Sequence, residues 1–109
     1  MQAVLAPRAL RRVVEYDSVT VWLREGDQLR IVAAQGFEND AERLDLRVEI
    51  SDSALFAEMD RTQAPILVPE VRLDPRFAAG EFQPTQSWLG APLVSKGRIL
   101  GVLALDKLE

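Results

Sequence analysis

The sequence predicts an α+β domain built on a mostly antiparallel sheet, and three observations support this fold class. Two pairs of segments, one near each end of the chain, show the alternating apolar pattern of β-strands and are joined by short glycine-containing turns. A stretch of helical apolar spacing lies between the two pairs. The chain has 109 residues, 48% of them hydrophobic, which fits one globular domain. We therefore expect a single domain over residues 1–109, with five to six strands and helices on both faces of the sheet.

The first third of the chain predicts a helix and a hairpin. Apolar residues at helical spacing follow Pro7, which favours a short amphipathic helix over residues 7–15. Residues 18–23 and 28–34 alternate apolar with polar side chains around a Glu-Gly-Asp turn, the pattern of a β-hairpin. Trp22 falls on the face opposite the other apolar residues of its strand, where we expect it to pack beneath a helix.

The middle of the chain predicts a third strand, a helix and a short fourth strand. Apolar and charged residues alternate strictly over residues 44–50, as in a half-exposed strand. Ser51 or Asp52 is placed to cap a helix that runs to about Arg61, since either side chain can accept a free backbone N–H. Residues 66–68 are apolar and lie between two prolines, which indicates a short buried strand.

The last third predicts a second hairpin, with strands over residues 87–95 and 98–105. Lys96-Gly97 forms its turn, and Gly97 supplies the positive φ that such a turn requires. Both alternating sets of the last strand are apolar: Ile99, Leu103 and Leu105 on one face, and Leu100, Val102 and Ala104 on the other. A strand that is apolar on both faces belongs in the centre of a covered sheet. We therefore expect the two hairpins to join through their inner strands.

Missing residue types exclude several classes of function. The chain has no cysteine and no histidine, which excludes thiolate nucleophiles, iron–sulfur clusters and histidine-ligated haem or zinc. Thirteen basic against seventeen acidic residues give a net charge of −4, which argues against nucleic acid as a partner. No apolar run approaches the roughly 20 residues of a membrane span. We expect a cytoplasmic protein that is not an enzyme, holds no cofactor and does not insert into a membrane.

Six stretches of the sequence resemble the GAF domain family, which comprises small ligand-binding and dimerising modules of signalling proteins. The stretches follow the family order and are residues 14–23, 29–37, 64–71, 74–77, 87–93 and 97–106. They are most similar to modules placed ahead of histidine kinases or diguanylate cyclases. The resemblance implies one sheet with the terminal helices on one face and a small-molecule pocket on the other.

The sequence differs from the family pattern at positions that several known ligand classes and reactions of the family require. Members that attach a bilin, bind haem or reduce free methionine sulfoxide use cysteine or histidine, and this chain has neither. Members that bind cyclic nucleotides carry an Asn-Lys pair at the end of the last strand, where this chain has Asp106-Lys107. The leading helix is short and the sequence ends at Glu109, where the family's closing helix would begin. Without a closing helix, part of one apolar sheet face would be exposed. We therefore expect a homodimer that buries this face or exchanges the helix containing Leu10 and Val14 between protomers.

The resemblance predicts a regulatory sensor module that binds an unidentified small molecule non-covalently and controls an attached kinase or cyclase output domain. The first alternative is a purely structural dimerisation module whose pocket is filled by its own side chains and takes no ligand. The second alternative is a small hydrolase that uses carboxylates alone.

Five residues are the candidate ligand contacts: Val68, Asp74, Arg76, Phe77 and Trp88. Arg76 could bind an anionic group through its forked guanidinium donors. Alternatively, Asp74 caps a helical turn that begins at the following proline and Arg76 is a solvated surface residue. Trp88 could pack on a planar ligand, or it could simply fill the core.

Overall fold

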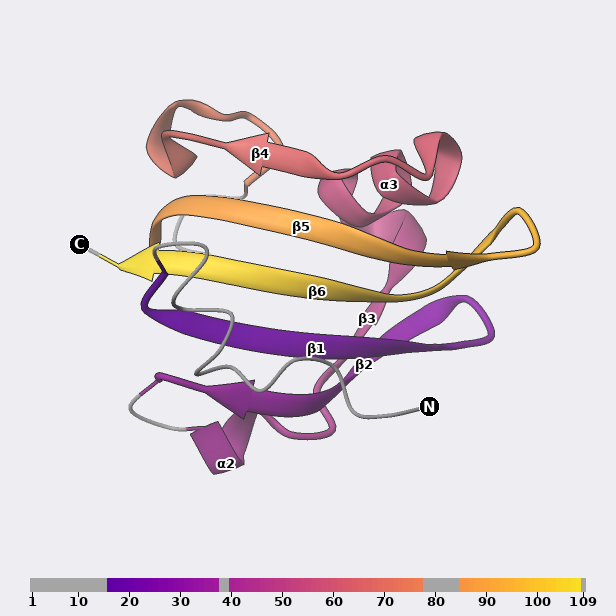
Figure 1. Ribbon diagram of the computed structural model, residues 1–109, viewed down its shortest axis with the longest axis horizontal. Helices are drawn as coiled ribbons and strands as arrows, with labels where there is room; N and C mark the ends of the chain where they lie inside the picture. The colour runs from indigo at the N-terminus through magenta and orange to yellow at the C-terminus, as the bar shows by residue number, and fades with distance from the viewer. Residues whose placement is uncertain (1–15, 38–39, 78–84, 109) are drawn as a thin grey trace.

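Six antiparallel strands form the framework of the computed structural model, which describes residues 16–37, 40–77 and 85–108 (Figure 1). The strands are β1 (Ser18–Glu25), β2 (Gln28–Gln35), β3 (Arg47–Glu49), β4 (Ile66–Val68), β5 (Thr85–Ser95) and β6 (Arg98–Leu108). The helical segments are α2 (Asp40–Arg43), η1 (Ile50–Asp52), α3 (Ala54–Thr62) and η2 (Val71–Leu73). The predicted α+β fold class is confirmed. The helix expected over residues 7–15 lies outside the described residues.

Two tight hairpins build the sheet, as the sequence predicts. The turn between β5 and β6 has positive φ at both Lys96 (53°) and Gly97 (73°), and this backbone geometry matches the twist of paired strands. The hairpins join through β1 and β6, where Val19 pairs with Leu105. The strand order is β3-β2-β1-β6-β5-β4, so β6 has a partner on both sides and lies near the centre, as expected.

A bulge in β6 overturns part of the predicted face assignment. Leu93 pairs with Gly101 and Val94 pairs with Ile99, which leaves Leu100 without a partner in β5. One extra residue inverts the alternation of the strand on its far side. Ile99 is therefore 2% exposed in the same core as Val102, whereas Leu100 is 50% exposed. The prediction that Ile99 shares a face with Leu103 and Leu105 is wrong.

The strand predicted over residues 44–50 is much shorter than expected, because only β3 has strand geometry. Before β3 the chain turns at Asp45, which has a φ of 67°. The Asp45 N–H donates to the Ile31 carbonyl at 2.9 Å, and the Ile31 N–H donates to the Leu46 carbonyl at 2.9 Å. These bonds to β2 fix the turn and leave Leu44 and Leu46 on the surface, 44% and 50% exposed.

Helix α3 begins at a serine cap one or two residues later than expected. The Ser53 Oγ accepts the backbone N–H of Phe56 at 3.2 Å. The prediction that Ser51 or Asp52 caps this helix is wrong because both residues belong to η1, a short 3-10 turn. That turn buries Ile50 in the core before α3 starts.

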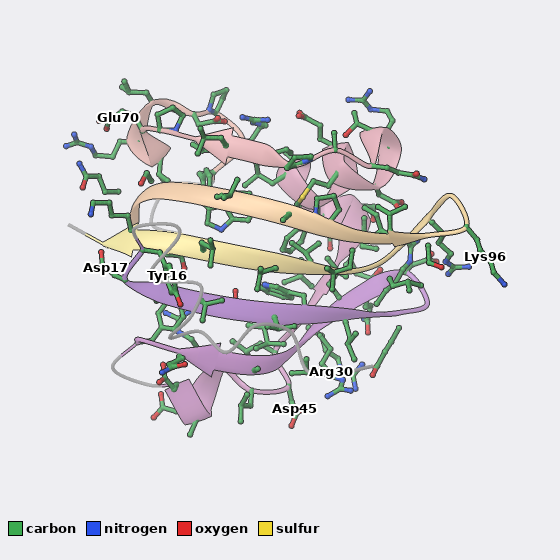
Figure 2. The ribbon with its side chains drawn as sticks, in the orientation of Figure 1. Tyr16, Asp17, Arg30, Asp45, Glu70 and Lys96 are labelled. Atoms are coloured by element: carbon green, nitrogen blue, oxygen red, sulfur yellow. The ribbon has the colours of Figure 1, made fainter. Side chains whose placement is uncertain are left out.

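The sheet carries a separate apolar core on each face. The larger core lies under α3, where the Phe56 ring packs edge-on against Trp22 with ring centroids 5.0 Å apart. This contact confirms that Trp22 packs beneath a helix. The smaller core on the other face consists of Tyr16, Val19 and Leu105, with Leu89 and Leu103 packed against it. Figure 2 shows Tyr16 at the end of the sheet where β1 begins and β6 ends.

Candidate functional site

Three of the five candidate ligand contacts meet on the α3 face of the sheet. Val68 of β4 pairs with Trp88 of β5, and the Phe77 ring lies edge-on to the Trp88 indole with ring centroids 5.8 Å apart. Val68, Trp88 and Phe77 are 1%, 3% and 8% exposed. Gly90 makes room for the indole, because a Cβ at this position would overlap its ring. The three side chains form one packed wall.

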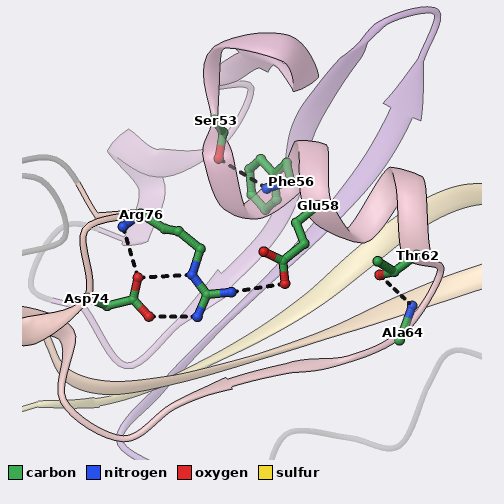
Figure 3. A network of polar contacts seen from close by, with 7 residues as sticks. All are labelled: Ser53, Phe56, Glu58, Thr62, Ala64, Asp74 and Arg76. Carbon is green, nitrogen blue, oxygen red and sulfur yellow. Dashed lines mark hydrogen bonds and ion pairs between the residues drawn. The ribbon is translucent and has the colours of Figure 1, made fainter.

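The other two candidates, Asp74 and Arg76, bind each other. Asp74 Oδ1 accepts both the backbone N–H and the Nε–H of Arg76 at 2.9 Å, and Asp74 Oδ2 accepts from Nη2 at 2.6 Å. Arg76 Nη1 donates to Oε2 of Glu58 on α3 at 3.0 Å. Figure 3 shows the guanidinium lying between the two carboxylates. The network ties the segment that follows η2 to α3.

Asp74 caps the turn that follows it, as one of the two sequence interpretations predicts, because its Oδ1 accepts the Arg76 backbone N–H. The turn covers residues 75–76 without continuing into a helix, and the Phe77 N–H donates to the Asp74 carbonyl at 3.1 Å. Hydrogen bonding from the Arg76 guanidinium holds the pKa of Asp74 below its usual range. An arginine has five N–H donors, and three of those on Arg76 bind carboxylates within the chain. A ligand anion at Arg76 stays a prediction.

A buried carboxylate that sequence reasoning missed lies beside the aromatic wall. Asp106 is 5% exposed and sits in β6 between Ser18 of β1 and Trp88 of β5. The Ser18 hydroxyl donates to Asp106 Oδ2 at 3.4 Å, and Oδ1 has no hydrogen-bond partner among the described residues. Burial raises the pKa of Asp106 to about 6, against the opposing effects of the Arg43 charge and of the Ser18 hydrogen bond. The alternation of the strand is a signal of its burial, since Asp106 follows Val102 and Ala104 on the core-facing side.

Helix α2 places a cation near this end of the sheet. Asp40 accepts the backbone N–H groups of Phe37 at 2.7 Å and Gly36 at 3.3 Å, and so fixes the entry into the helix. At the other end of α2, the Arg43 guanidinium lies 3.7 Å from the centroid of the Phe37 ring. The Arg43 charge favours the ionised form of Asp106 but does not outweigh the loss of hydration. The site thus combines a buried acceptor, an aromatic wall and a nearby positive charge.

Two kinds of feature are not found among the described residues. In the described part of the chain, no group of three or more His, Cys, Asp or Glu residues is gathered so that it could hold a metal ion. None of the helices in the same part is long and apolar enough to cross a membrane.

The family is decided by comparison with known proteins. The model of the GAF domain matches residues 6–108. The chain belongs to the GAF domain family. GAF domains are regulatory sensor modules of signalling proteins and are generally non-catalytic. They are commonly attached to kinase or other output domains. Comparison with curated protein sequences gives no match.

Solved structures share the fold at low sequence identity. The GAF domain/HD domain protein from Geobacter sulfurreducens superposes with a TM-score of 0.81 at 12% identity, covering 93% of this chain and 69% of that one. The GAF domain of a phosphoenolpyruvate-protein phosphotransferase from Coxiella burnetii gives 0.76 at 19%, covering 92% and 61%. A type II free methionine-R-sulfoxide reductase from Thermoplasma acidophilum gives 0.72 at 21%, covering 92% and 67%. The last of these shows that the fold also supports an enzyme.

Proposed function

We propose that this GAF domain is a regulatory sensor that binds a small molecule without covalent attachment and thereby controls an attached output domain. The observation that carries the proposal is the Asp106 carboxylate, buried beside Trp88 with one oxygen unpartnered in the described part of the chain. A buried polar atom left without a partner costs about 1–3 kcal/mol, and such costs are typical of functional sites. The proposed ligand contacts are Val68, Asp74, Arg76, Phe77, Trp88 and Asp106.

Ligand binding would act by changing the relative stability of two arrangements of the domain. The turn that carries Phe77 is joined to α3 through the ion pair between Arg76 and Glu58, so a ligand that contacts Phe77 also bears on α3. A ligand shifts such an equilibrium only by its differential affinity for the two arrangements. The output domain we propose is a histidine kinase or a diguanylate cyclase. The Coxiella neighbour, a GAF domain of a phosphotransferase, supports attachment of such a module to an enzyme.

We also propose a homodimer formed through the sheet face of the smaller core. On this face Leu67 is 65% exposed. It borders a hollow of about 90 Å³ lined by Tyr16, Leu67, Ser87, Trp88, Leu89, Leu105 and Lys107. Burying apolar surface of this kind drives association. Light scattering at high protein concentration should give a dimer that Leu67→Glu converts to a monomer. The control Leu73→Glu, at a position 81% exposed, should leave the dimer intact.

The alternative is a structural dimerisation module that takes no ligand. The observation that favours it is the dense wall of Val68, Phe77 and Trp88, whose side chains already fill space on the α3 face.

A thermal-unfolding screen separates the sensor from the dimerisation module. The panel contains nucleotides, cyclic nucleotides, amino acids and aromatic acids. A ligand at about 100 times its dissociation constant stabilises the folded state by about 2.7 kcal/mol, which is easily detected. Trp88→Phe should abolish the shift. Trp22→Phe is the matched control, because Trp22 is also buried on the α3 face but packs against Phe56. A panel that produces no shift refutes the sensor and supports the dimerisation module.

A further inference from the structure

The Asp106 carboxylate has open hydrogen-bonding capacity inside the protein. A carboxylate can accept hydrogen bonds at about four lone-pair positions. One long bond of 3.4 Å from Ser18 reaches Oδ2, and no side chain of the described residues donates to Oδ1. The next polar residue on this face of β1 is Thr20, whose hydroxyl accepts from Trp22 Nε1 at 3.0 Å and makes no hydrogen bond to Asp106 Oδ1. Asp106 is therefore a strong acceptor that lacks its donor.

The surroundings of Asp106 select for a positively charged donor. Its cross-strand neighbour Trp88 and the adjoining Phe77 supply aromatic rings, which attract cations through their π faces. A hydrogen bond between two charged groups is roughly twice as strong as one between neutral groups. An anion would be repelled by the carboxylate, and a neutral donor would add no charge to the partial compensation that Arg43 of α2 already gives it. The aromatic rings and the carboxylate charge therefore both favour a cationic ligand over an anionic or a neutral one.

We propose that Asp106 anchors the protonated amine or amidine group of a small aromatic or apolar ligand, an inference that rests on the sensor function proposed above. The ligand cation donates to Oδ1, and its apolar part lies against the wall formed by Trp88 and Phe77. Asp106 is thus the residue that sets the charge class of the ligand.

Two matched pairs of probes test this assignment. Benzamidinium and benzylammonium carry the cation, while benzamide and benzyl alcohol have nearly the same size without the charge. Titration calorimetry of the full chain at pH 7 should show the cations binding at least tenfold more tightly than their neutral partners. Asp106→Asn should reduce the affinity for each cation at least tenfold, to the level of its neutral partner. Asp27→Asn removes the same charge at a side chain that is 94% exposed, in the turn between β1 and β2, and should have no effect.

The pH dependence gives a second readout that a merely structural role would not produce. Because the pKa of Asp106 is about 6, its ionised fraction and hence cation affinity should rise about tenfold between pH 5 and pH 7. The described groups that face Asp106 are the Arg43 charge of α2, Ser18 of β1 and Trp88 of β5, and the last two carry no group that titrates in this range. Binding of the neutral probes should not change with pH.

The outcomes separate this inference from the function on which it rests. Equal binding of cationic and neutral probes, unchanged cation binding in Asp106→Asn, or no cation binding at millimolar concentration overturns the inference. If compounds of another charge class still shift thermal unfolding, the sensor function stands. If neither the probes nor the wider panel bind, both fail.

Discussion

The substitution Asp106→Asn should stabilise the protein at neutral pH and change how its stability depends on pH. The pKa of Asp106 is raised from an ordinary value of 3.8 to about 6 by burial. The folded state therefore prefers the protonated carboxyl. Its stabilising contribution is present in full below about pH 4 and is lost as the pH rises through about 6. A shift of about two pKa units corresponds to a loss of about 3 kcal/mol at pH 7.

Urea denaturation at several pH values measures this effect directly. The amide that replaces the carboxyl group in Asp106→Asn cannot ionise. The variant should therefore not show the decrease in free energy of unfolding that ionisation of Asp106 causes in the wild type between about pH 4 and pH 7. The free-energy difference between variant and wild type should consequently grow by about 3 kcal/mol over this range. Taking a difference also cancels the contributions of Asp74 and Glu25, whose pKa values are lowered by hydrogen bonds from arginines.

A matched exposed carboxylate provides the control. Asp27→Asn removes the same charge at a side chain that is 94% exposed, and it should leave the pH dependence of stability as it is in the wild type. The reasoning about Asp106 is refuted if the difference between Asp106→Asn and wild type stays constant across the range. A wild type that gains stability relative to the variant as the pH rises would refute it equally.

Three further substitutions test local features of the fold by chemical denaturation. Ile99→Ala should lower the free energy of unfolding by about 2–5 kcal/mol because it leaves a cavity in the larger core. Leu100→Ala, at the exposed bulge, should lower it by well under 1 kcal/mol, and equal losses for the two variants would contradict the bulge. Ser53→Ala should cost about 0.5–2 kcal/mol through loss of the α3 cap, and Ser51→Ala should be close to neutral; the reverse order would restore the cap predicted from sequence. Gly90→Ala should cost about 1–3 kcal/mol because the added methyl group overlaps an indole ring, and a neutral result would show that the ring moves freely.

The sequence predicted the hairpins and the central strand well because their signals are local. Alternation in β1 and β6 and the turn at Gly97 each depend on a few adjacent residues. It failed where contacts between distant segments override the local pattern. The left-handed turn at Asp45 is held by hydrogen bonds to Ile31, which is far from it along the chain. The alternating pattern of residues 44–50 carries no information about Ile31, so it could not predict this turn.

The candidate site was only partly predictable. Val68, Phe77 and Trp88 were named from the family resemblance, and the structure brings these three together. Asp106 was noted only as part of the Asp106-Lys107 pair that stands in place of the family's Asn-Lys pair, and its burial was not predicted, since a charged residue normally reaches solvent. Its burial follows from its place in the centre of the sheet, with Ser18 on one side and Trp88 on the other.

The sequence alone determined the fold class, the two hairpins and the absence of cysteine and histidine chemistry, since periodicity, turn residues and composition are properties of the chain itself. Only the tertiary structure decided the β6 bulge, the link from Arg76 to Glu58 and the burial of Asp106. Strand register and burial depend on which distant segments meet, and a side chain's hydration, charge state and free hydrogen-bonding capacity are set by those neighbours.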